Sequence, residues 1–488
     1  MTHIHDRYSL FLPEKPRSNP YRVWLLLGLI LATLWFLMSV NRGQVKPLLQ
    51  ATLTPTRSAK SYLLEAEAYY NAGKLDDPKT DQDAIGSYQM AVQINPQDVN
   101  AWAQMARLQA YSSAIVSTDA ERKQRLENAL ASARKAAELS PDDSSIQAIL
   151  AFVLDWNASS NLITTEERDA YIKEAERVAA RAYNLDPNNV LALAYYAEVL
   201  LDQQRWQQAL QFAEQAILLG GDLMDTHRVY ATVLEYQGDY RVSIEEYQKA
   251  IALTPNLTFL HLRVGLGYRN LGNRAAAQGN AEVAKKLYED ALNYFDQAAR
   301  INQQLAVRDP QPYIAIAKTY AQMGEFFVAA RNAEKALKFD SANADTYAQL
   351  GSIYVQAKNY EYALPALQCA VEGCLALWLA PKDNPDSENA IYCKELGGCG
   401  VKETETATFL FGSDYISKTV SIQPLPLTNL NVAYYYIRYG SVLGYLNRSD
   451  SGYCERALKL MQDLRTSPFG SDVFLLQNIE DTESLCQR

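Results

Sequence analysis

The chain of 488 residues carries all six of its cysteines near the C-terminal end. They are Cys369, Cys374, Cys393, Cys399, Cys454 and Cys486. An even set of cysteines confined to one end indicates disulfides. We expect Cys454 to pair with Cys486, and the other four to pair among themselves. Free thiols are one alternative, and a zinc site is another, although the spacing C-x4-C-x18-C-x5-C lacks the C-x2-C pairs of zinc ribbons.

Histidines, the other residues with obvious chemistry, are few. His3 and His5 lie near the N-terminus, and His227 and His261 lie 34 residues apart. A metal bridged by the latter two is conceivable, but their spacing favours equivalent packing positions between helices. With so few histidines a Ser-His-Asp or Cys-His catalyst is not indicated. No acidic pair stands out as a general acid and base. We predict no enzymatic activity and no catalytic, cofactor or metal site.

The elements that position these residues form a repeat. The segments 193–216, 227–250, 313–336 and 347–370 share a spacing of large, apolar and small residues typical of two packed helices. Small residues let the two helices cross closely, and prolines such as Pro96 and Pro255 end the second helix. We count eight units from about residue 60 to 375, and 434–464 has the pattern of a degenerate ninth. The predicted crossing-point residues are Ala66, Ala106, Ala151, Ala197, Ala231, Gly265, Ala317 and Gly351.

This pattern resembles the tetratricopeptide repeat (TPR), a unit of 34 residues. The spacings Tyr347-Leu350-Gly351-Tyr354 and Ala84-Tyr88-Ala91-Pro96 carry the resemblance. It implies an all-α, right-handed superhelix of about eight to nine helix pairs. It also implies a concave groove, lined by the first helix of each pair, that binds a segment of a partner protein. One variant of the family holds a C-terminal carboxylate with a Lys/Asn clamp. Capture of such a tail is not predicted, because no asparagine occupies the corresponding positions. These positions hold Glu67, Arg107, Phe152, Glu198, Thr232, Leu266, Lys318 and Ser352.

Six side chains are candidates for contact with the partner in this groove. Tyr111, Phe152 and Trp156 should project inward and could anchor a partner side chain. Alternatively, the loop at 157–168 covers them as ordinary core. Three arginines could line the same trough and pair with an acidic partner, or could simply be solvated; they are Arg107, Arg228 and Arg269.

An uncharged run near the N-terminus suggests a membrane anchor. Nineteen residues without a charge lie between Arg22 and Arg42. As a helix they would be about 28 Å long, close to the thickness of a bilayer core. We predict a tail at 1–20, a transmembrane helix at 21–41 and a linker at 42–59; a cleaved signal peptide is the alternative. Equal numbers of basic residues lie before and after this run, so their distribution does not indicate which side of the membrane the body occupies. Disulfides therefore decide the predicted orientation, with the N-terminus cytoplasmic and the body periplasmic or on the cell surface.

The charge of the body argues against nucleic-acid binding. The net charge is −10, but residues 1–60 carry eight Lys/Arg and two Asp/Glu, so the remainder carries −16. Such a body repels phosphate backbones. The TPR solenoid is expected at 60–375. A disulfide-braced, irregular insertion should follow at 376–428, with a β-hairpin near 407–411 and 418–422. A degenerate TPR and capping helix should occupy 429–488.

Together these features predict a membrane-anchored, extracytoplasmic scaffold for protein–protein interaction. By resemblance it would be an assembly or accessory subunit of a membrane or envelope complex, with no small-molecule substrate. Two alternatives stay open at this point. The first is a cytoplasm-facing adaptor or a redox or zinc sensor. The second is an enzyme whose chemistry lies in the insertion at 376–428.

Overall fold

The computed structural model describes residues 19–41, 57–77, 80, 82–160, 162–381, 389–390, 415–447 and 452–487. The chain divides into two compact units, Met1–Arg57 and Ser58–Arg488. Within the first unit, the described element is the helix α1 (Pro20–Asn41).

The predicted transmembrane helix at 21–41 is contradicted. In the part of the chain that the structure describes, no helix has the length and apolar character needed to cross a membrane. A spanning helix needs about 20 consecutive, predominantly apolar residues. In α1 the apolar run is bounded by Arg22 and interrupted by the polar residues Thr33 and Ser39 before Asn41. The predicted single-pass anchor is corrected accordingly, together with the membrane orientation, which presupposed that anchor.

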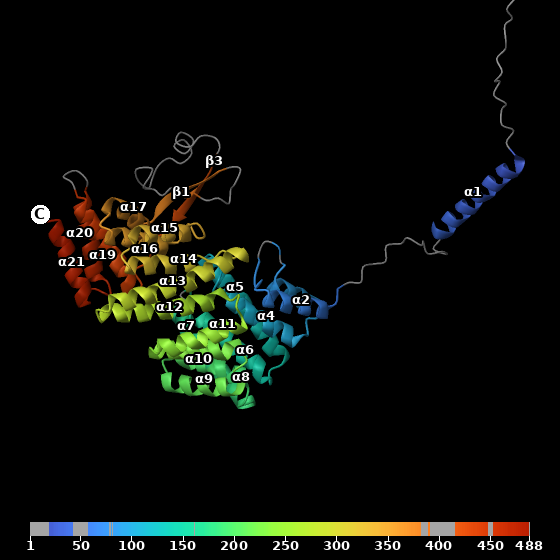
Figure 1. Cartoon of the computed structure of the whole chain (residues 1–488), viewed down its shortest axis with the longest axis horizontal. Helices are drawn as coiled ribbons and strands as arrows, with labels where there is room; N and C mark the ends of the chain where they lie inside the picture. The colour runs from blue at the N-terminus through green and yellow to red at the C-terminus, as the bar shows by residue number, and fades with distance from the viewer. Residues whose placement is uncertain are drawn as a thin grey trace, which may run out of the picture. The chain divides into compact units, whose positions relative to one another are not determined.

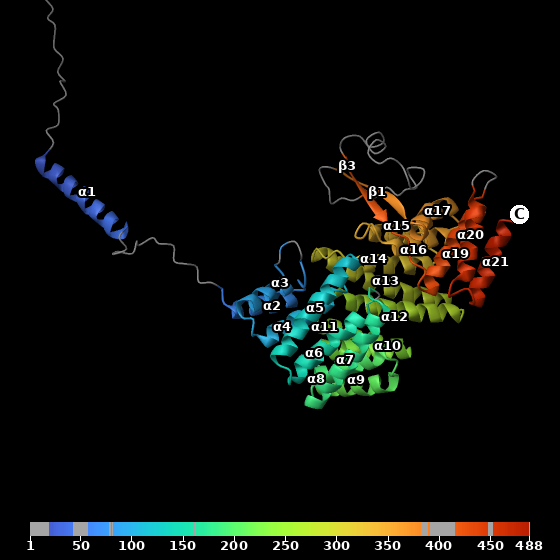
Figure 2. The same cartoon turned by 180° about the vertical axis from the view of Figure 1, so that it is seen from behind.

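The second unit consists of helix pairs that follow one another in chain order (Figures 1 and 2). Eight pairs precede the strands, and the predicted all-α superhelix of helix pairs is confirmed. The pairs are α2 (Ala59–Asn71) with α3 (Ala84–Ile94), α4 (Val99–Ser112) with α5 (Asp119–Leu139), α6 (Ser144–Ala158) with α7 (Thr165–Leu185), α8 (Val190–Asp202) with α9 (Trp206–Gly220), α10 (Met224–Gln237) with α11 (Tyr240–Leu253), α12 (Thr258–Ala277) with α13 (Ala281–Gln304), α14 (Gln311–Gln322) with α15 (Phe326–Leu337), and α16 (Ala344–Gln356) with α17 (Tyr360–Val371).

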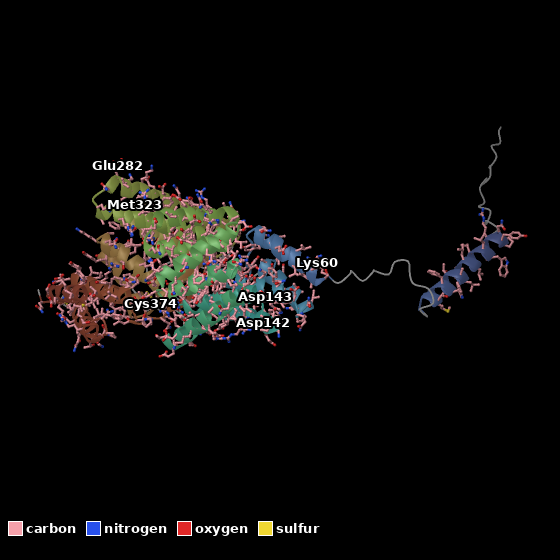
Figure 3. All side chains as sticks on the ribbon, turned by 90° about the horizontal axis from the view of Figure 1, so that it is seen from below. Lys60, Asp142, Asp143, Glu282, Met323 and Cys374 are labelled. Carbon is pink, nitrogen blue, oxygen red and sulfur yellow. A yellow bond between two sulfur atoms is a disulfide. The ribbon has the colours of Figure 1, made fainter. Side chains whose placement is uncertain are left out.

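Local sequence determines where these helices start and how closely they pack. Asp98 and Asp143 cap α4 and α6 by accepting hydrogen bonds from backbone N–H groups of the first turn; Asp143 is labelled in Figure 3. Side-chain caps satisfy donors that have no partner inside the helix. At the crossing point of α12 and α13, a Cβ added to Gly265 would lie 2.3 Å from the ring of Phe295. The small crossing-point residues therefore permit the close approach that the repeat pattern predicts.

The superhelix returns on itself, so that pairs distant in sequence come into contact. Phe259 at the start of α12 stacks on Tyr111 of α4, with ring centroids 5.6 Å apart. The Ser117 hydroxyl, in the turn between α4 and α5, donates to the carbonyl of Arg308, which precedes α14. The largest buried apolar cluster accordingly runs from Ala66 to Val264. The concave side of the early pairs is thus enclosed by later ones.

A small sheet and three further helices complete the C-terminal end. The strands β1 (Cys374–Pro381), β2 (Asn389–Ala390) and β3 (Tyr415–Ile422) form an antiparallel sheet in the order β2-β1-β3. The predicted strand at 418–422 lies in β3, but it pairs with β1, with Cys374 opposite Ile422. The segment 407–411, which we expected as its partner, lies outside the described residues. The helices α19 (Leu430–Tyr445), α20 (Tyr453–Thr466) and α21 (Val473–Leu485) follow.

Two disulfides join elements of this end. Cys369 in α17 is bonded to Cys374 at the start of β1, and Cys454 in α20 is bonded to Cys486 just after α21. Cys393 and Cys399 lie outside the described residues. The first bond therefore holds β1 to α17, and the second holds the end of α21 to α20.

Candidate partner-binding groove

A buried carboxylate, Asp225 at the start of α10, organises the concave side. It forms an ion pair with Arg107 of α4 and accepts a hydrogen bond from the Tyr111 hydroxyl. The Tyr195 hydroxyl of α8 also donates to it, at 2.9 Å. Burial alone would raise the pKa of Asp225, but Arg107 and then Arg228 hold that pKa below its ordinary value. Asp225 is thus a charged group that ties together three helices.

A second buried ion pair lies beside the first. Arg228 of α10 donates to both carboxylate oxygens of Glu198 in α8, at 2.6 and 2.7 Å. The indole N–H of Trp156 in α6 donates to the same carboxylate at 3.2 Å. The Arg228 guanidinium also lies 5.5 Å from the ring centroid of Phe152. Such a bidentate pair, backed by aromatic faces, fixes the relative positions of α6, α8 and α10.

The structure brings five of the six predicted groove residues together, but it changes their role. Tyr111 and Phe152 are 0% exposed, so they are core residues and not an open aromatic anchor. Phe259 of α12 provides the cover over Tyr111, in place of the loop at 157–168 that we had considered. Trp156 is only partly buried and stays available at the surface of the groove.

The three predicted arginines are engaged in contacts within the chain and are not free to pair with a partner as we expected. Arg107 and Arg228 are paired inside the chain, with Asp225 and Glu198. Arg269 lies apart from them, where it donates to the carbonyl of Ala315 at 3.4 Å and faces the ring of Phe295. A general role of these arginines in holding an acidic partner does not fit these contacts.

A cavity of about 440 Å³ remains between α6, α8, α10 and α12 on this side. Its volume lies in the range of ligand-binding clefts. Ser159 and Tyr236 are exposed, so the cavity reaches solvent at this rim. It is lined by Ser113, Ala114, Arg122, Leu126, Asp155, Trp156, Ser159, Ser160, Glu198, Leu201, Asp202, Arg228, Thr232, Tyr236, Tyr247, Phe259, Leu262, Arg263, Leu266 and Gln311.

Two aspartates that we did not single out from sequence lie in the wall of this cavity. Burial, followed by the nearby carboxylates Asp202 and Glu198, raises the pKa of Asp155 well above its usual value. Burial also raises the pKa of Asp202, whose carboxylate accepts a hydrogen bond from the Ser159 hydroxyl. The position of Asp202 within its repeat could have indicated that it lies in the groove. Asp202 stands five residues after the crossing-point residue Ala197, as Trp156 does after Ala151.

The two internal histidines occupy packing positions. Nδ1 of His227 lies 2.6 Å from Glu246 and Nε2 lies 2.8 Å from the carbonyl oxygen of Gly221. Nε2 of His261 lies 2.9 Å from the carbonyl oxygen of Pro255. Among the described residues, no group of three His, Cys, Asp or Glu side chains could hold a metal ion. The equivalent spacing of the two histidines therefore reflects equivalent places between helices.

Comparisons with known proteins agree with this architecture. No family model matches the chain. The Photosystem I assembly protein Ycf3 of Synechococcus elongatus is 25% identical over 146 residues, which is 28% of this chain and 84% of that relative. A solved structure of a monomeric IFIT1 mutant with Gppp-AAAA is 13% identical with a TM-score of 0.50, covering 88% of this chain and 90% of that one. The APC/C hetero-tetramer Cut9–Hcn1 is 14% identical with a TM-score of 0.44, covering 64% of this chain and 52% of that one, about half its length.

These findings define the class of protein. The chain is an all-α scaffold of stacked helix pairs whose concave side is enclosed by its own later pairs. Its fold is that of tetratricopeptide repeat proteins, as the repeat pattern predicts. At these low identities the likeness to solved structures shows the fold alone.

Proposed function

We propose that this chain is a non-catalytic scaffold that binds a segment of a partner protein at the cavity between α6, α8, α10 and α12. The observation that carries the proposal is the cavity itself, which lies on the concave side and reaches solvent beside Tyr236. Trp156 and Phe259 offer partly buried aromatic faces there. Aromatic side chains in a concave pocket are typical anchors for a partner side chain.

We infer further that the binding serves assembly of a protein complex. The similarity to Ycf3, described as a Photosystem I assembly protein, supports an assembly role for the shared repeat region. The fold supports the same idea, because stacked helix pairs supply an extended surface for binding. The partner is therefore expected to be a subunit or an intermediate of the complex being assembled.

Site-specific photo-crosslinking in the cells that contain the chain tests this proposal. A photoreactive amino acid replaces Tyr236, which lines the cavity and is 56% exposed. The matched control places it at Phe327, which is 85% exposed in α15 and does not line the cavity. We expect one discrete partner to be crosslinked through position 236 and not through position 327. Equal products at both positions, or none at position 236, would contradict the proposal.

A further inference from the structure

The charges around the cavity do not balance. Each arginine in the wall has a carboxylate close by. Arg228 is paired with Glu198, and Arg122 with Asp119 at 3.1 Å. Arg263 lies 3.5 Å from Glu235. Two further carboxylates, Asp155 and Asp202, line the same cavity. Within the described parts of the chain, neither forms an ion pair with a lysine or arginine. The lining itself holds three arginines and three carboxylates. Two of these arginines are already matched by Asp119 and Glu235, which lie outside the lining. Among the described residues, Asp155 and Asp202 are therefore the carboxylates of the wall that are left without a cationic partner.

Of these two carboxylates, Asp155 is the one that the surrounding protein satisfies least. Its side chain is only 2% exposed, and its Oδ1 atom has no hydrogen-bond partner among the described residues. An isolated buried carboxylate costs several kcal/mol unless it is paired or neutralised. Burial and the neighbouring acids raise the pKa of Asp155, the direction expected for a carboxyl group whose charge is poorly compensated. A cation entering the cavity would offset this cost.

We propose that this cavity binds a lysine or arginine side chain of the partner segment, and that Asp155 and Asp202 pair with its positive charge. This inference rests on the proposed scaffold function. Asp202 stands nearer the rim and is half-buried, whereas Asp155 lies at depth. A long side chain entering beside Tyr236 would meet Asp202 before Asp155. Its aliphatic part would pack on the apolar side chains of the wall.

The other wall residues favour a side-chain cation. Trp156, Tyr236 and Phe259 present aromatic rings in the same cavity, and aromatic faces attract ammonium and guanidinium groups. Divalent metals instead require several oxygen, nitrogen or sulfur ligands converging on one point. No such cluster of three occurs in the residues that the structure describes. The site thus combines negative charge with apolar walls, which complements the chemistry of lysine and arginine.

The test uses saturation-transfer NMR on the full chain with three small probes. Nα-acetyl-lysine amide and Nα-acetyl-arginine amide carry the cation, and Nα-acetyl-norleucine amide is their neutral control. We expect transfer to the two cationic probes only. Asp155→Asn and Asp202→Asn should each reduce the transfer at least several-fold. Glu246→Gln, which alters a buried carboxylate that does not line the cavity, should leave it unchanged. Thermal melting of each variant verifies that it is folded.

Several results would overturn this inference. They are no transfer to the cationic probes, equal transfer to the norleucine probe, or unchanged transfer in both folded aspartate variants. The crosslink at position 236 separates the two proposals. If the Asp155→Asn/Asp202→Asn double variant still crosslinks the partner at full yield, the cation site is refuted and the scaffold function stands. If the cationic probes bind but position 236 crosslinks no partner, the scaffold function fails by itself.

Discussion

The two ends of the repeat stack are stabilised in different ways. In the region from α2 to α13, which we call the closed region, α12 returns to α4 and one large apolar cluster joins pairs that are distant in sequence. Ion pairs buried beneath that contact tie α4, α8 and α10 together. In the region from α14 to α21, which we call the terminal region, the apolar clusters are smaller and two disulfides join consecutive elements.

This difference shows that non-covalent contacts and disulfides stabilise different parts of the stack. Pairs that meet distant pairs bury surface on several sides, so non-covalent contacts can hold them. At the end of a stack, each pair contacts only its neighbours, and a covalent bond limits the freedom of the unfolded segment. The comparison predicts that ionic substitutions are costly in the closed region and that reduction of disulfides is costly in the terminal region.

Loss of the buried Arg228–Glu198 pair should have the largest effect. Arg228→Met leaves the Glu198 carboxylate buried without its cation, and breaking a buried pair in this way costs about 3–5 kcal/mol. The control Arg205→Met removes a half-exposed pair with Glu176, which is worth at most about 1 kcal/mol. Urea unfolding of both variants measures the difference. Equal losses would show that the closed region does not depend on its internal charges.

Removal of the Cys454–Cys486 bond should destabilise the terminal region alone. The cysteines are 32 residues apart, and loop-closure entropy then gives about 3.7 kcal/mol. The cysteines of the Cys369–Cys374 bond are 5 residues apart, so this bond is expected to contribute less, about 2.1 kcal/mol. Hydrogen exchange of the Cys454→Ser/Cys486→Ser variant should show faster exchange in α20 and α21, with α4 to α12 unchanged. Faster exchange throughout the chain would remove the distinction between the regions.

Enlarging Gly265 should test how closely the closed region is packed. The added methyl group of Gly265→Ala would clash with the buried ring of Phe295, and overpacking of this kind costs about 1–3 kcal/mol. The double variant Gly265→Ala/Phe295→Leu should recover part of the loss, because the smaller side chain leaves room. A double-mutant cycle of unfolding free energies measures the coupling. Strict additivity of the two changes would contradict the packing at this crossing point.

A change in the pH dependence of stability, measured as a slope, is expected at the border of the two regions. Burial raises the pKa of Asp309 to about 7 in the folded chain. Between pH about 4 and about 7 the folded chain keeps a proton that the unfolded chain has lost, so stability falls as pH rises through this window. The slope from this group is at most about 1.4 kcal/mol per pH unit. Asp309→Asn should flatten that part of the curve of unfolding free energy against pH. Parallel curves for the two proteins would refute it.

The sequence predicted the helix pairs well because the pattern that forms them is local. Crossing-point residues such as Ala197 and Gly351, and turn residues such as Pro96, act within one unit and need no knowledge of distant contacts. The sheet was predicted less well. The strand β1 is a continuous apolar run without alternation, which periodicity does not distinguish from the end of a buried helix.

The site could be predicted only in part, because it depends on how the superhelix returns. Tyr111 was predicted to project into an open groove, yet it is buried and covered by Phe259, more than 100 residues later in the chain. Nothing local to Asp225 distinguishes it from an ordinary acidic residue at a helix start, although it joins three helices. The predicted N-terminal anchor is contradicted, since no helix among the described residues is long and apolar enough to cross a membrane.

The central claim is that the cavity in the closed region is where a partner binds. Hydrogen exchange of the full chain, alone and with the partner identified by crosslinking, tests it most directly. The account predicts slower exchange on binding at the ends of α6, α8 and α10 that surround Asp202 and Tyr236, with α15 and α21 unchanged. Unchanged exchange around the cavity, together with protection in the terminal region, would contradict it.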